Sequence, residues 1–131
     1  MTGVQTCALP ICFELLDRER ISYCVLRGFD GSPDGIGNDV DIVIAKSVNV
    51  AEIANILRQN RVQLRARIVR QIGCYFILLC EQEFAIPQFL ILDFVTACEV
   101  EGLEYVSSDA ILESRIKRED FWTPSHSFQF H

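Results

Sequence analysis

The chain has 131 residues, of which 50 % are hydrophobic and 23 % are charged, a balance that excludes a disordered chain and allows one domain with a sizeable core. Its net charge is −6, which argues against non-specific binding to a nucleic-acid backbone, because such binding needs clustered lysines and arginines. No apolar run reaches the ~18 residues of a transmembrane helix, so we expect no membrane partner.

The six cysteines have no spacing typical of a metal or redox site. No pair is spaced CxxC, and no group of cysteines and histidines has zinc-finger spacing. We expect them to be small buried hydrophobes in a reduced, cytoplasmic protein. The alternative is a disulfide framework, which a chain this apolar does not need for stability.

The two ends of the chain differ in character from its middle. The string TGVQTCALPI resembles translated sequencing-adapter read-through seen in assembled metagenomic data, so we expect residues 1 to about 11 to be non-native. The domain is then expected to span residues 12–125, and residues 126–131 to be a truncated end of the reading frame.

Periodicity predicts an α+β fold, with a mixed or antiparallel sheet of about five strands and helices packed on one face. A helix is expected to end within 12–20, and further helices are expected at 50–60, capped by Asn49 or Ser47, and at 108–114. The glycine-rich segment 28–38 is expected to be a loop. Segments with the apolar or alternating character of strands are 21–26, 39–45, 63–70, 73–80, 88–95 and, in a short extended form, 121–124. Short turns join the segments 63–70, 73–80 and 88–95, which predicts an antiparallel meander.

Two carboxylates alternate with apolar residues in GNDVDIVI, residues 37–44. Side chains at positions i and i+2 of a strand share a face, so Asp39 and Asp41 are expected to lie side by side. The residues between and after them would anchor the strand in the core: Val40, Ile42 and Ile44. Aspartate is disfavoured in strands, and two neighbouring carboxylates repel each other unless a cation lies between them. The pattern therefore predicts ligands for a divalent metal such as Mg²⁺, which prefers hard oxygen donors.

Asp93 interrupts the apolar strand QFLILDFV, where an isolated charge would be costly to bury. Its neighbours Leu92 and Phe94 would face the core, which places Asp93 on the opposite face. If this strand lies beside the strand of Asp39, three carboxylates converge. The alternative is an ion pair with an arginine of a neighbouring strand: Arg65, Arg67 or Arg70.

A strand, a glycine-containing turn, an Asp-x-Asp strand and a later single Asp together resemble the nucleotidyltransferase superfamily, which has the DNA polymerase β-like fold. In this chain Gly28 is followed by Phe29, nine further residues and then Asp39-Val40-Asp41. Phe29 stands where the family usually has glycine or serine. YCVLRGFDGSPDGIGNDVDIVI, LILDFVTACEVEGLEYV and REDFWTPS resemble more closely the nucleotidyltransferase-like proteins of bacterial polysaccharide gene clusters, over about residues 21–125.

The resemblance implies transfer of a nucleoside monophosphate from an NTP, ATP or another, to the hydroxyl of a small-molecule or sugar-like acceptor. Asp39, Asp41 and Asp93 would ligate Mg²⁺ or Mn²⁺ and act as the catalytic carboxylates, with Asp93 also helping to deprotonate the acceptor. The nucleotide would be bound through Arg27, Gly28 and Asn38, with Gly28 allowing close approach of a phosphate to the backbone.

Other interpretations of the same residues stay open. Asp39 and Asp41 could lie at a solvated junction between loop and strand, and Arg27 could form a surface salt bridge. The basic stretch between positions 58 and 70 is more typical of a solvated face than of a nucleic-acid site. At the level of function, the alternative to an enzyme is a catalytically inactive protein with this fold that binds nucleotide or a partner, including the toxin–antitoxin type.

Overall fold

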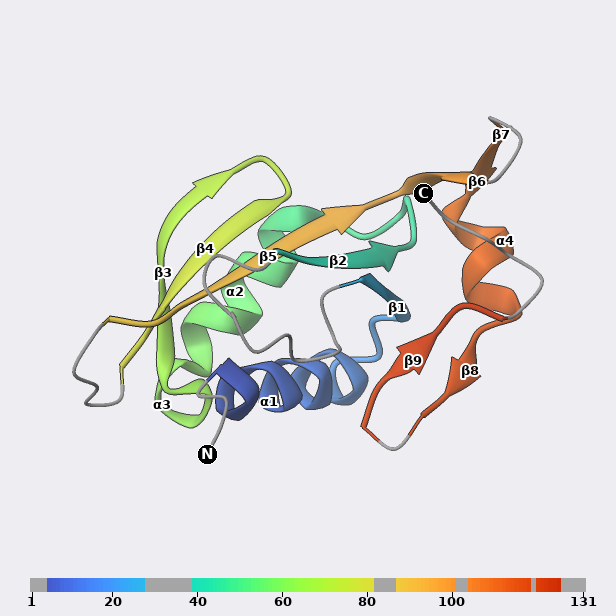
Figure 1. Ribbon diagram of the computed structural model, residues 1–131. Coiled ribbons are helices and arrows are strands. Elements are labelled where there is room, and N and C mark those ends of the chain that lie inside the picture. The colour runs from blue at the N-terminus through green and yellow to red at the C-terminus, as the bar shows by residue number, and fades with distance from the viewer. Residues whose placement is uncertain (1–4, 28–38, 82–86, 101–103, 119, 126–131) are drawn as a thin grey trace.

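The computed structural model describes residues 5–27, 39–81, 87–100, 104–118 and 120–125. It confirms the α+β class, with a five-stranded mixed sheet in the order β1-β2-β5-β4-β3 (Figure 1). The strands of this sheet are β1 (Tyr23–Arg27), β2 (Asp39–Ile44), β3 (Ala66–Ile72), β4 (Tyr75–Cys80) and β5 (Phe89–Val95). Pairing is antiparallel except between β2 and β5, which run parallel.

The meander predicted from the sequence is present as β3, β4 and β5, each antiparallel to the next. The turn between β3 and β4 is explained by the residue type that forms it. Gly73 has a φ of 59° between β3 and β4, a conformation that favours glycine because it has no Cβ. The first predicted strand of the meander begins too early, because residues 61–64 form a helical turn, α3 (Arg61–Leu64). Arg65 ends this turn in the left-handed conformation, and the strand starts only at Ala66.

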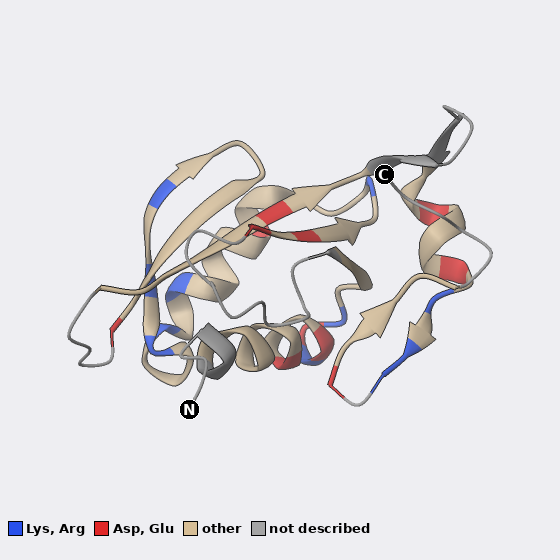
Figure 2. Ribbon diagram, viewed as in Figure 1, with Lys and Arg blue, Asp and Glu red and all other residues tan. Residues whose placement is uncertain are grey.

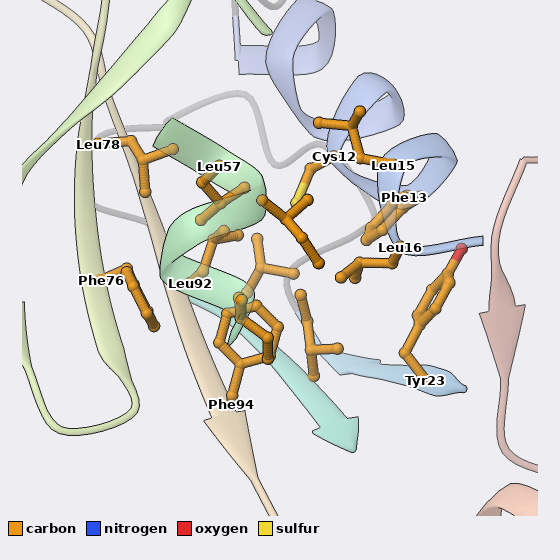
Figure 3. Packing of buried hydrophobic residues seen from close by; sticks show 14 of the residues in the cluster. Cys12, Phe13, Leu15, Leu16, Tyr23, Leu57, Phe76, Leu78, Leu92 and Phe94 are labelled. Atoms are coloured by element: carbon orange, nitrogen blue, oxygen red, sulfur yellow. The ribbon is translucent and has the colours of Figure 1, made fainter. Parts of the chain in front are cut away.

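One face of the sheet is covered by α1 (Gln5–Arg18), α2 (Val50–Gln59) and α3, which enclose the main core. Apolar residues of α1 and α2 meet the inward residues of the strands, as Leu16, Leu57 and Leu92 do in Figure 3. The helix α2 begins as predicted, since the side chain of Asn49 accepts a hydrogen bond from the amide of Ala51 at 2.9 Å.

The helix α1 starts seven residues before the expected domain boundary. Ala8 is only 2 % exposed, and Leu9 and Ile11 pack against the main core. Part of the segment set aside as non-native therefore packs as the first turns of a core helix. The non-native origin of that segment stays a prediction.

A smaller apolar cluster lies on the opposite face of the sheet, under α4 (Ser108–Glu113). Cys24 of β1 and Val43 of β2 point away from the main core and contact Ile111 and Leu112 of this helix. Because α4 covers only this part of the face, it bounds the region in which the carboxylates of β2 and β5 lie.

Two short antiparallel ribbons complete the described chain. They are β6 (Ala97–Val100) with β7 (Glu104–Ser107), and β8 (Ile116–Lys117) with β9 (Trp122–Thr123). The indole of Trp122 lies against the guanidinium of Arg115, 4.1 Å from the ring centroid, and its Nε1 donates to Asp17 of α1 at 3.3 Å. The hydrogen bond to Asp17 thus holds the β8–β9 ribbon against α1.

Cys12, Cys24, Cys74 and Cys80 are reduced cysteines that form no disulfide, as expected for cysteines that serve as small hydrophobes. Three of these four are buried, and burial raises the pKa of the Cys12 thiol to about 12. Within the described ranges, no helix has the length and apolar character needed to cross a bilayer.

Candidate functional site

The parallel pairing of β2 with β5 places three carboxylates on one face of the sheet. The Cα partner of Asp41 is Asp93, and that of Asp39 is Ile91, one row further along. Adjacent strands lie about 4.8 Å apart, so Asp41 and Asp93 are direct neighbours. Asp39 is exposed, whereas Asp41 and Asp93 are partly buried. The condition stated from the sequence, that the strand of Asp93 lies beside the strand of Asp39, is met, and Figure 2 shows the acidic positions of β2 and β5 next to each other.

Buried residues hold these carboxylates on the outward face. Val40 and Ile42 alternate with the two aspartates of β2 and are 2 % and 0 % exposed. Leu92 and Phe94 flank Asp93 and are 0 % and 2 % exposed. A register slip of one residue in either strand would carry an aspartate into the core and an apolar side chain to the surface, so the hydrophobic pattern fixes the position of the site.

Tyr75 of β4 also belongs to this site, although the sequence analysis did not single it out. It is the Cα partner of Asp93 on the side away from β2. Its hydroxyl donates a hydrogen bond to Oδ2 of Asp39 at 3.4 Å. Partial loss of solvent, together with the negative charges of Asp39 and Asp93, raises the pKa of Tyr75 above its usual value. The phenol therefore stays protonated at neutral pH and acts as a donor.

One signal in the sequence could have identified Tyr75. The segment GCYFILLC precedes β5 in the predicted meander, and Tyr75 is its only residue with a polar side-chain oxygen. Its distance from Asp93 depends on the register of β4 against β5, which the apolar pattern of the two strands alone does not specify. The structure pairs Tyr75 with Asp93 and Leu79 with Phe89, and this register brings the phenol to the carboxylates.

The donor atoms of this site suit a hard divalent cation, since all three acidic side chains are carboxylates. In the structure, however, these side chains do not converge on a common position for a metal ion. In the part of the chain that the structure describes, no group of three or more His, Cys, Asp or Glu side chains could hold a metal ion as it stands. To hold a metal ion, the three side chains would have to turn toward one another, and Asp39 would have to give up its hydrogen bond to Tyr75.

The expected nucleotide-binding residues are only partly described. Arg27 is the last residue of β1, and its Cα partner is Asp41, so the end of β1 lies beside the carboxylates. Its side chain, like the whole of Gly28, Phe29 and Asn38, lies outside the described residues.

The alternative of an ion pair between Asp93 and an arginine of a neighbouring strand is not supported by the strand order. Arg67 and Arg70 lie on β3, and β4 separates that strand from β5. Arg67 contacts Glu81 at 3.8 Å. Arg65 is in the turn that precedes β3.

Comparison with known proteins gives this chain no family. No protein-family model matches it, and no curated protein matches it.

Proposed function

We propose that the domain is a metal-dependent nucleotidyltransferase-like protein, which transfers a nucleoside monophosphate from an NTP to a hydroxyl of a small-molecule or sugar-like acceptor. One observation carries the proposal. Asp41 and Asp93 are partners on neighbouring parallel strands, and Asp39 lies one row away on the same face. This arrangement agrees with the order of motifs by which the sequence resembles the nucleotidyltransferase superfamily.

Asp39, Asp41 and Asp93 would hold Mg²⁺ or Mn²⁺, and the bound ion would supply positive charge to neutralise the phosphate oxygens of the NTP. Asp93 lies on the strand next to Asp41, where it would accept the proton of the acceptor hydroxyl. The acceptor oxygen forms a bond to the α-phosphorus, the bond from that phosphorus to the bridging oxygen breaks, and pyrophosphate leaves.

A protein that binds an NTP without transferring it is the second candidate. The hydrogen bond between Tyr75 and Asp39 favours this candidate, because it engages one of the three carboxylates with the protein itself.

Thermal unfolding with each of the four NTPs and Mg²⁺ tests the proposal. Mg²⁺ with the preferred NTP is expected to raise the Tm of the wild type, and this rise should be lost in Asp41→Asn. The matched control is Glu14→Gln, which removes the same charge from an exposed position on α1, on the other side of the sheet. Absence of a shift with every NTP would refute nucleotide binding.

A second measurement separates the enzyme from the binding protein. Pyrophosphate release in the presence of a panel of sugar acceptors is expected of the enzyme and should be lost in Asp93→Asn. Binding of Mg²⁺ and NTP without pyrophosphate release from any acceptor would favour the second candidate.

A further inference from the structure

The outward face of the sheet changes from acidic to basic between β2 and β3. Along one row of Cα partners the residues are Asp39, Ile91, Ile77 and Arg70, on β2, β5, β4 and β3 in turn. Partners in a sheet have their side chains on the same face, so Arg70 shares the face of the carboxylates. Figure 2 shows this separation, with acidic positions on β2 and β5 and basic positions on β3.

The next row of Cα partners has apolar residues on β5 and β4 and an arginine on β3, but no acidic residue. Phe89 of β5 is partnered with Leu79 of β4, which is partnered with Arg67 of β3. The side chains between the two charged ends are apolar and incompletely covered. Phe89 is 41 % exposed, and Ile77, Leu79 and Ile91 are partly exposed. The face thus has an acidic end, an apolar middle and a basic end.

At the basic end of the face, the positive charges of the two arginines are not fully neutralised by the acidic side chains that the structure describes. Arg70 is exposed, and it takes part in none of the ion pairs formed within the described ranges. Arg67 is 3.8 Å from Glu81, but that carboxylate is engaged more closely by Arg61, whose Nε donates to it at 2.7 Å. In a chain of net charge −6, two arginines on the site's own face are a local exception.

The geometry points to a subsite for an anionic group of the acceptor, formed by Arg70 with Arg67. This inference rests on the proposed function and specifies the substrate class of the same site. The acceptor is a small molecule whose reacting hydroxyl lies at the carboxylates and whose phosphate or carboxylate group lies at β3. Two to three strand spacings separate these ends, about 10–14 Å.

Each part of the face suits one part of such a molecule. A guanidinium binds a phosphate or a carboxylate through two parallel hydrogen bonds, which fixes its orientation as well as its charge. The apolar middle, formed by Ile77, Leu79, Phe89 and Ile91, can pack against the carbon face of a sugar ring. A neutral acceptor could not form the hydrogen bonds between a guanidinium and an anionic group. The phosphates of a nucleic acid would be repelled by the carboxylates at the acidic end.

Another role for arginines on an edge strand is to prevent that strand from pairing with another chain. β3 is at the edge of the sheet and has a register irregularity between Ile68 and Arg70. Irregularities of this kind and charged side chains both protect edge strands from pairing with another chain. The two roles differ in what they require. Edge protection needs only charge, whereas a subsite needs Arg70 itself and an anionic ligand.

The test is an NMR titration of the ¹⁵N-labelled full chain with Mg²⁺ and α,β-methylene-ATP, an analogue that cannot release pyrophosphate. The probes are glucose 6-phosphate, glucuronate and neutral glucose, so that phosphate and carboxylate are distinguished from each other and from the uncharged ring. Glucose 6-phosphate, glucuronate or both are expected to shift amide signals of β3 and β4 at concentrations where glucose does not.

Arg70→Gln is expected to weaken binding of the anionic probe about tenfold. The matched control is Arg58→Gln, an exposed arginine of α2, on the other side of the sheet, and it should bind like the wild type. Equal binding of glucose, equal weakening by Arg58→Gln, or no shift of β3 amides with any probe would each overturn the inference.

The same samples separate this inference from the proposed function. If the ATP analogue binds with Mg²⁺ and depends on Asp41, but no anionic probe is preferred, only the acceptor subsite is refuted. If no nucleotide binds, the proposed function fails, and the acceptor role of Arg70 fails with it.

Discussion

Removing the hydroxyl of Tyr75 should strengthen metal binding at the three carboxylates. In the structure this hydroxyl donates to Oδ2 of Asp39, and a carboxylate that turns toward a cation has to give up that bond. Tyr75→Phe keeps the ring and removes only the donor. Since Tyr75 is partly exposed and its bond to Asp39 is long, the change should lower the free energy of unfolding by no more than about 1 kcal/mol.

The size of the effect follows from the geometry of the bond. An intramolecular hydrogen bond contributes about 0.5–1.5 kcal/mol, and its contribution falls as the bond lengthens. At 3.4 Å the bond to Asp39 is longer than the usual O–H···O distance of about 2.5–3.0 Å, so its contribution is taken from the lower part of this range, about 0.5–1 kcal/mol. Because about 1.4 kcal/mol corresponds to a factor of ten, Mn²⁺ should bind two- to fivefold more tightly to Tyr75→Phe.

Electron paramagnetic resonance of free Mn²⁺ measures this change directly. A double-mutant cycle supplies the control, because Tyr75→Phe should have no effect on Mn²⁺ affinity in a chain that already carries Asp39→Asn. Weaker Mn²⁺ binding to Tyr75→Phe would refute the reasoning, since it would mean that the phenol positions Asp39 for the metal. An equal gain in the Asp39→Asn background would show that the effect does not pass through Asp39.

Three further predictions concern the stability of the fold. Leu92→Ala should cost about 2–5 kcal/mol in chemical denaturation, because the side chain is fully buried between the sheet and the helices; a loss below 1 kcal/mol would contradict its place in the core. Asn49→Ala should cost about 1 kcal/mol by loss of the cap of α2, whereas Asn49→Asp should restore most of it. The hydrogen bond from Arg61 lowers the pKa of Glu81 in the folded chain. The pair therefore stabilises the fold at pH values above about 4.3, the pKa of glutamate in the unfolded chain, and this stabilisation is lost as the pH falls through the lower pKa of the folded chain. Tm measured across pH 2–6 should accordingly fall less steeply on acidification in Arg61→Gln, and an unchanged slope would refute the coupling.

The sequence alone was sufficient for most of the elements, because their signals are local. Alternation in DVDIVI and the apolar run around Asp93 predicted β2 and β5, and the stripe after Asn49 predicted α2 with its cap. Where local signals conflicted, the prediction was wrong. Leu64 alternates with arginines as a strand would, yet it lies in a helical turn, because the left-handed Arg65 delays the start of β3.

The sequence also determined which faces of β2 and β5 carry the carboxylates, since the period of two along a strand separates them from the buried residues. It did not determine which residues of the two strands are opposite each other. Parallel strands are joined through distant segments, so no local turn sets their register. Only the tertiary structure pairs Asp41 with Asp93, brings Tyr75 beside them from β4, and places Arg70 on the same face three strands from Asp39.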